Sequence, residues 1–427
     1  MDSYLALEKM LLLLCADLAI IIGAARFFGW LFGKMGQPPV VGEILAGVIL
    51  GPSLLGRLYP GAISTMLTPQ TTGVLSAMAQ VGLILLMLLI GLEFPFDRLG
   101  QAARASSLVA VAGIVVPFAS SYALAGWLYR IAPVAAPELA FKLFFATAVS
   151  ITAIPIMGRI LMHTRLTRTR MGLTSITAAA IDDVLGWILL GAVVSMVSHG
   201  RANLGTLAIS FAGVTVLGVS FWAAGRWGLS RLRVPRTPGG GLTPAWLAAV
   251  LVIVFVSATA TNALGVFSIF GGFLCGIAGS FHKDLAEGVR NSIGDLVSVL
   301  FLPIFFVFSG LRTDIGSLGS DGRLWLALAA VIAVSCVSKF GATTLAAKAA
   351  GLPWKESASI GLLMNTRALM ALVVINIGAD MGVISPAAFF WLVTMALFTT
   401  VITTPILVRA YPSPEAAEGW SEKRASV

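Results

Sequence analysis

Charged residues are scarce in this chain. Its 427 residues include 28 Lys or Arg and 19 Asp or Glu, about 11% in all, whereas a soluble domain of this length carries roughly 107 charges at the usual fraction. The shortage excludes an ordinary soluble protein. A mean hydropathy of +0.95 also excludes an intrinsically disordered chain, which is poor in apolar residues. Most of the chain must therefore face lipid or its own interior.

Cysteine and histidine are rarer still. They are scattered singly at Cys15, Cys275, Cys336, His163, His199 and His282. This spacing contains neither a disulfide framework nor a set of zinc ligands. The net charge of +9 does not indicate nucleic-acid binding, because the bases lie between apolar runs and do not gather on a polar face with interleaved aromatic residues. We therefore expect no cofactor and no nucleic-acid partner.

Long apolar runs are abundant, and each is about the 20 residues that a membrane-spanning helix needs. Because no cleavage pattern follows Met1, we expect the first helix to be retained. The runs predict an all-α polytopic membrane protein with thirteen transmembrane helices, near residues 10–32, 38–56, 70–92, 106–129, 138–162, 171–197, 204–227, 244–261, 264–281, 292–311, 323–347, 355–378 and 385–409.

The Lys and Arg residues between the predicted helices fall mostly on one side of the membrane. Alternating the sides places 17 of them on one face and 6 on the other. The positive-inside rule then puts the N-terminus outside and the C-terminus in the cytoplasm, in a plasma (inner) membrane. We expect residues 1–411 to form one transmembrane domain and residues 412–427 a short cytoplasmic tail.

Several charges lie where the bilayer should exclude them. Asp182 and Asp183 are adjacent in the sixth helix, and a charge at mid-membrane costs at least about 2.5–3.5 kcal/mol on insertion scales. Adjacent helical side chains point about 100° apart, so one carboxylate can pair with a fixed cation while the other faces an aqueous cavity. Lys339, central in an apolar run, is the natural fixed partner. The alternative is a set of buried salt bridges that only fix helix packing.

Two predicted helices carry polar interruptions at similar depth. The fifth contains Ser150-Ile151-Thr152-Ala153-Ile154-Pro155 and the twelfth contains Asn365-Thr366-Arg367. Proline frees a backbone carbonyl that lipid cannot satisfy, so this backbone must face protein or water. Discontinuous helices in paired positions indicate a secondary transporter's binding site. A simple proline kink is the alternative interpretation for the fifth helix.

The helix order also predicts two inverted six-helix repeats. Repeat one covers about 10–197, a linker helix covers 204–227, and repeat two covers about 244–409. An offset of seven helices reverses the direction of each partner and pairs the two interrupted helices. We expect these two discontinuous helices to cross. The run Gly47-Val48-Ile49-Leu50-Gly51 is a close-packing motif that fits intrachain packing as readily as a dimer interface.

With these features the chain resembles the monovalent cation:proton antiporter-2 family, which includes Kef-type and Nap-type exchangers. The resemblance covers about residues 5–410. It rests on Gly36-Gln37-Pro38-Pro39-Val40-Val41-Gly42-Glu43-Ile44-Leu45-Ala46-Gly47 with Gly51-Pro52-Ser53, on the Thr152/Pro155 break, on Asp182-Asp183, on Lys339 and on Asn365-Thr366-Arg367.

The resemblance implies a role for each site residue. It implies that Asp183 alternately binds a proton and an alkali cation, that Asp182 pairs with Lys339, and that Thr152 borders the ion site. Asp-Asp with Lys is similar to electrogenic exchangers, which move more than one proton per cation. Ser150 and Asn365 are possible supporting residues. The partner of Arg367 is open, with Glu43 as a suggestion.

The sequence therefore predicts a transporter and not an enzyme: a Na⁺ or K⁺/proton antiporter that works by alternating access. In keeping with the resemblance, we expect a homodimer. Na⁺, K⁺ or Li⁺ and protons are the expected partners, together with the lipid bilayer. Three alternatives stay open: a gated cation channel or efflux pathway on the same fold, a proton-coupled exporter of an organic cation or metabolite, and an intramembrane enzyme. The last is disfavoured because two catalytic aspartates would come from facing helices.

Overall fold

The computed structural model describes residues 2–59, 61, 68–93, 103–132, 134–164, 166, 169–198, 204–229, 233–264 and 267–410. The regular structure of these residues is helical apart from one isolated β-bridge between Arg236 and Leu242. The prediction of an all-α protein is confirmed. The predicted tail, 412–427, lies outside the described residues.

The chain divides into two compact units, and each draws on both halves of the sequence. Unit 1 comprises residues 1–28, 43–94 and 191–312. Its helices are the first part of α1 (Asp2–Lys34), most of α2 (Pro39–Leu50), α3 (Leu55–Leu58), α5 (Pro69–Leu92), α10 (Leu204–Ala223), η2 (Ala224–Gly228), α11 (Pro244–Ala263), α12 (Ser268–Ser280), α13 (Lys283–Leu296), η4 (Val297–Phe301) and α14 (Leu302–Leu311).

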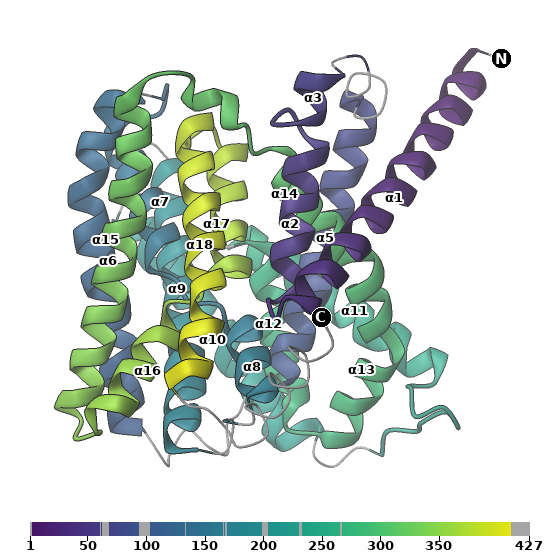
Figure 1. Ribbon diagram of the computed structural model, residues 1–427. Helices are drawn as coiled ribbons and strands as arrows, with labels where there is room; N and C mark the ends of the chain where they lie inside the picture. The colour runs from purple at the N-terminus through teal and green to yellow at the C-terminus, as the bar shows by residue number, and fades with distance from the viewer. Residues whose placement is uncertain are drawn as a thin grey trace, which may run out of the picture. The chain divides into compact units, whose positions relative to one another are not determined.

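Unit 2 comprises residues 29–42, 95–190 and 313–427. In it α6 runs beside α15, and α7, α17 and α18 pack together (Figure 1). Its helices are α6 (Ala103–Ile131), α7 (Glu138–Ser150), α8 (Ile154–His163), most of α9 (Arg170–Ser198), η5 (Ile315–Leu318), α15 (Gly322–Ala349), α16 (Trp354–Met364), α17 (Ala368–Asp380) and α18 (Pro386–Ala410).

Ten helical runs in the described part of the chain are long and apolar enough to cross a membrane. They overlap ten of the thirteen predicted ranges. The other three ranges, 138–162, 204–227 and 264–281, overlap α7 with α8, α10 with η2, and α12 respectively. The run of α16 and α17 is 94% buried, against 22% for α15, so α16 and α17 lie inside unit 2 and α15 lies at its surface.

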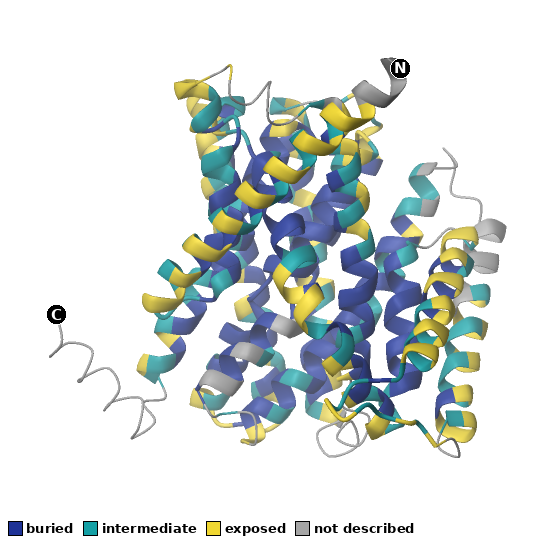
Figure 2. Ribbon diagram, turned by 90° about the vertical axis from the view of Figure 1, so that its right-hand side faces the viewer, coloured by how far each residue is buried: buried dark blue, intermediate teal, exposed yellow. Residues whose placement is uncertain are grey.

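The surface helices expose apolar residues. Val337 and Leu345 of α15 are more than half exposed, whereas Ser335, Lys339 and Thr343 on the opposite side of the same helix are buried. Figure 2 shows this alternation of exposed and buried residues along the outer helices. A soluble protein does not leave such apolar faces in water, so these faces are suited to lipid.

One helix begins earlier than the sequence predicts. The tenth predicted span starts near residue 292, but the helix starts at Lys283 and continues through η4 into α14. The ring of His282 accepts a hydrogen bond from the Leu285 N–H at 3.2 Å and caps the helix. Leu285, Val289 and Ile293 are buried on one face, so this charged segment is held as an amphipathic helix.

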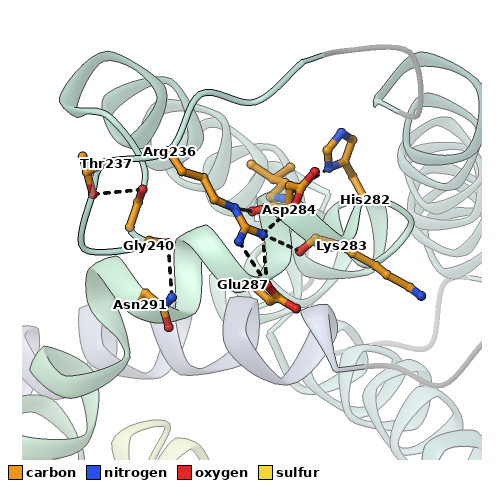
Figure 3. Close-up of polar contacts among 10 residues, drawn as sticks. Arg236, Thr237, Gly240, His282, Lys283, Asp284, Glu287 and Asn291 are labelled. Carbon is orange, nitrogen blue, oxygen red and sulfur yellow. Dashed lines mark hydrogen bonds and ion pairs between the residues drawn. The ribbon is translucent and has the colours of Figure 1, made fainter.

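The loop before α11 is fastened to α13 by Arg236. Its guanidinium lies 3.0 Å from Asp284 Oδ1 and 3.1 Å from Glu287 Oε2 (Figure 3). The Asn291 side chain donates to Gly240 O at 3.1 Å. Gly240 has φ +78°, a conformation that glycine adopts without steric cost. The glycine run therefore forms a turn docked on α13.

Glycines bring two pairs of helices in unit 1 into backbone contact. On α2, a Cβ at Gly47 would overlap the Val307 carbonyl of α14 and lie 2.8 Å from Gly310 Cα. On α12, a Cβ at Gly276 would overlap the Leu88 carbonyl of α5 and lie 2.8 Å from Gly91 Cα. The run that begins at Gly47 thus packs within the chain.

We expect Gly91→Ala in α5 to destabilise the fold by about 1–3 kcal/mol, because its methyl group would overlap the Phe273 carbonyl. Gly73→Ala on the same helix is the control, because no atom lies within 4 Å of the added Cβ. Thermal unfolding in detergent gives the comparison, and equal midpoints for the two variants would contradict the packing argument.

Candidate functional site

The first interruption lies between α7 and α8. α7 ends at Ser150, Ile151 is extended with φ −77° and ψ 144°, and α8 starts at Ile154. Pro155 is the second residue of α8, where a backbone N–H has no partner within the helix, so proline is compatible with a helix that starts here. The backbone of Ile151–Ala153 therefore offers polar groups inside the apolar interior of unit 2.

The second interruption separates α16 from α17 at Asn365–Arg367. The two interruptions are hydrogen-bonded to each other. The Ala153 N–H donates to Thr366 O at 3.0 Å, and the Thr152 hydroxyl donates to Met364 O at 3.1 Å. Each break thus satisfies backbone groups of the other, which is why two irregular segments can exist in a buried interior.

The Asp182 side chain binds the backbone of the first interruption. Its Oδ2 accepts the Thr152 N–H at 2.8 Å and the Lys339 ammonium at 3.1 Å. Asp182 and Lys339 are fully buried. The Lys339 ammonium also donates to Ser150 O. One carboxylate oxygen therefore joins α9, α15 and the break.

This arrangement matches the charge at the helix ends. The C-terminus of α7 carries a partial negative charge and receives the ammonium of Lys339 at Ser150 O. The chain entering α8 carries a partial positive charge and receives the Asp182 carboxylate at the Thr152 N–H. The pair thus stabilises both ends of the interruption.

Asp183 is placed differently. It is 2% exposed, and its Oδ1 has no hydrogen-bond partner among the residues that the structure describes. The described ion pairs connect Lys339 with Asp182 and not with Asp183. A buried carboxylate in such surroundings must either hold a proton or be neutralised by a cation. The two adjacent acids are therefore chemically distinct.

Arg367 is also fully buried, at the start of α17. Its Nη2 donates to Ser335 O at 2.8 Å, and its Nη1 lies 3.2 Å from Met395 Sδ. Both contacts are within unit 2. Glu43, the suggested partner, is a buried residue of unit 1. That pairing stays a prediction.

The two supporting residues lie at the interruptions. Ser150 uses its hydroxyl to donate to Thr147 O at 3.0 Å, so its carbonyl is the group that faces Lys339. Asn365 is buried, and its Oδ1 has no partner within the described part of the chain. The structure thus brings together seven of the eight predicted residues in one unit.

Sequence reasoning did not find the contacts of Arg367. Ser335 lies one helical turn before Lys339, which could have signalled its place on the buried face. Met395 had no signal, because it is one apolar residue in an apolar helix. The described residues contain no group of three or more His, Cys, Asp or Glu side chains that could hold a metal ion. Carboxylate, hydroxyl and carbonyl oxygens remain as ligands, and these suit hard cations.

Residues 22–410 match the family described as sodium/hydrogen exchanger, transmembrane. The chain belongs to this family. The match covers most of the chain and confirms the predicted kinship with cation:proton antiporters, so the protein is a multi-pass membrane transporter and not an enzyme.

Two relatives illustrate the range of the family. The Na⁺/H⁺ antiporter NhaS4 of Synechocystis is 36% identical over 406 residues, covering 95% of this chain and 98% of that protein. Cation/H⁺ antiporter 18 of Arabidopsis thaliana is 34% identical, over 96% of this chain and 50% of that protein. This antiporter therefore spans about half the length of its plant relative.

A solved structure shows the same fold. The sodium proton antiporter MjNhaP1 from Methanocaldococcus jannaschii superposes with a TM-score of 0.64, covering 93% of this chain and 96% of that one, at 17% sequence identity. At this sequence identity, the structural similarity is evidence for a shared fold alone.

We expect Lys339→Met to destabilise the protein by about 3–5 kcal/mol, because it leaves Asp182 buried without its cation. Adding Asp182→Asn should restore much of the loss, since the uncompensated charge is then gone. Thermal unfolding of the two single variants and the double variant measures the coupling. Simple addition of the two losses would show that the residues do not act as a pair.

Proposed function

We propose that this protein exchanges a monovalent cation, Na⁺ or K⁺, for protons, with Asp183 as the site that both occupy in turn. The observation that carries the proposal is the contrast in counter-ion within the acid pair: Lys339 pairs with Asp182, and the described ion pairs give Asp183 no such partner. Each of the two acids has one buried oxygen without a hydrogen-bond partner among the described residues. A proton and an alkali cation are the two species that neutralise such a carboxylate.

Competition at Asp183 couples the two fluxes. When a proton occupies the carboxylate, the cation leaves, and when the cation binds, the proton leaves. Thr152, Asn365 and backbone carbonyls of the interruptions are the further oxygen ligands that this proposal assigns within the same unit. Lys339 and Asp182 hold these segments in place during the exchange.

We further propose that the protein alternates access to this site from the two sides of the membrane. Unit 2 is the moving body, because both interrupted helices and both acids belong to it. We assign the N-terminus to the outside and the C-terminus to the cytoplasm of a plasma membrane, on the distribution of Lys and Arg. We also propose that the protein forms a homodimer.

The thirteen-helix inverted repeat is also part of the proposal. Pairing the second span with the ninth and the third with the tenth maps α2 onto α12 and α14 onto α5. The contact of Gly47 with Gly310 then corresponds to that of Gly276 with Gly91. In both pairs the overlapped carbonyl lies three residues before the glycine that is contacted. This correspondence supports a two-fold relation between the halves.

Asp183→Asn should abolish cation-dependent proton movement in proteoliposomes while the protein stays folded, because the amide cannot bind a proton and attracts cations weakly. Asp17→Asn is the control: Asp17 is another buried acid within a helix, but it belongs to unit 1. If the Asp183→Asn variant retained exchange, the assignment of Asp183 as the shared proton and cation site would be wrong.

The resemblance to electrogenic exchangers predicts that more than one proton moves per cation. Asp183 alone exchanges one proton for one cation without net charge movement, so electrogenic exchange requires a second proton-carrying group. A membrane potential imposed with valinomycin and a potassium gradient, in a Na⁺/proton assay, should then speed exchange when the side that receives protons is negative. The opposite polarity should slow it. A rate that does not respond to either polarity would mean electroneutral transport.

A further inference from the structure

α16, the helix that precedes the second interruption, lies beside several buried side-chain oxygens that have no hydrogen-bond partner among the described residues. Glu356 is the third residue of this helix. Glutamate at this position usually accepts a hydrogen bond from the N–H of the capping residue, but the cap here is Pro353, which has no N–H. Glu356 Oε2 is buried and unpartnered among the described residues. The local helix therefore does not explain where this carboxylate points.

Two threonine hydroxyls follow about one and a half turns further along. Thr344 Oγ1 on α15 and Thr404 Oγ1 on α18 are buried and lack partners in the described part of the structure. A Cβ added at Gly361 of α16 would overlap Thr344 Oγ1, which places this hydroxyl against α16. Thr403 donates to Leu362 O at 3.3 Å, so α18 meets α16 at the next residue.

Neighbouring threonines on the same helices behave differently. Thr343 donates to the carbonyl of Lys339 at 2.6 Å, and Thr400 donates to that of Ala396 at 2.8 Å. The hydroxyl of a buried helical threonine usually donates a hydrogen bond to the backbone carbonyl four residues earlier in this way. Thr344 and Thr404, at the level of Gly361 and Leu362, therefore differ from Thr343 and Thr400, because their hydroxyls have no hydrogen-bond partner among the described residues.

Asn365 ends the series at the interruption. Its Oδ1 is buried without a described partner, and the preceding Met364 carbonyl accepts the hydroxyl of Thr152. At 1.5 Å per residue, Glu356 lies about 7.5 Å below Gly361 along the helix axis, and Asn365 lies about 6 Å above it. Each interval is short enough for one or two water molecules to bridge it, and buried oxygens usually have such partners.

We propose that α16, with Thr344 of α15 and Thr404 of α18, forms a proton path from the cytoplasmic end of unit 2 to the ion site, with Glu356 at its entrance, and that the path operates while the site faces the cytoplasm. The proposal rests on the proposed function and on the orientation given there. A proton taken up by Glu356 moves along water and the hydroxyls of Thr344 and Thr404. Each hydroxyl accepts one proton and releases another, so the path itself is unchanged.

Three basic side chains belong to the helix ends at the entrance of the proposed path. Lys355 precedes Glu356, Lys348 lies in the last turn of α15 over the Trp354 ring at 5.4 Å, and Arg409 lies in the last turn of α18. The positive charges of these bases repel a hydrated alkali cation from the path. The path is therefore assigned to protons and not to the alkali cation.

Glu356→Gln tests the entrance. In proteoliposomes given pulses of sodium chloride or potassium chloride, we expect the maximum rate of proton movement to fall about fivefold, because the amide cannot relay a proton. The half-saturating cation concentration should stay at the wild-type value, since Asp183 is untouched. A loss of structure would instead lower the unfolding midpoint in detergent.

The paired variant Thr344→Val with Thr404→Val tests the middle of the path. Valine keeps the shape and removes the hydroxyls, so we expect a lower maximum rate with an unchanged midpoint of unfolding. Thr400→Val is the matched control, because Thr400 is buried on the same helix but donates to its own backbone. Its rate should equal that of the wild type.

The two proposals fail in different ways. Wild-type rates in both Glu356→Gln and the paired valine variant would overturn the proton path while leaving exchange at Asp183 intact. An increase in the half-saturating cation concentration without a change in maximum rate would also overturn it, because it would assign these oxygens to the cation. Absence of exchange in the wild-type protein would overturn the proposed function itself.

Discussion

One oxygen atom, Asp182 Oδ2, holds the centre of unit 2 together. It accepts hydrogen bonds from the Thr152 N–H and the Lys339 ammonium, and Lys339 in turn reaches the end of α7. Three helices that are distant in sequence meet at this point. Because both side chains are fully buried, removing either charge leaves the other without compensation, so the interruption depends on the pair. The neighbouring Asp183 takes no part in this ion pair among the described residues.

The sequence was informative where polar residues are costly. Asp182, Asp183, Lys339 and the two interruptions stood out because a membrane segment tolerates so few charges, and the structure places them together. Long apolar runs likewise identified the helices to within a few residues in most cases. Scarcity made these features visible without any knowledge of the three-dimensional arrangement.

Other features could not be predicted because they depend on contacts between distant segments. The hydrogen bond from Arg367 to Ser335 O uses a backbone carbonyl, which every residue possesses. The early start of α13 depends on a histidine cap and on a docked loop. Thr344 and Thr400 look alike in the sequence, yet one satisfies its hydroxyl locally and the other does not. Patterns along one helix do not contain this information.

The glycine contact between α5 and α12 fixes more than distance. At Gly91 and Gly276 the two backbones meet without an intervening side chain. A shift of about one turn along α5 would bring Met87 to the point that Gly91 occupies, where no side chain fits. The two helices therefore cannot slide past each other in small steps, and any motion of this pair must be as a single rigid piece.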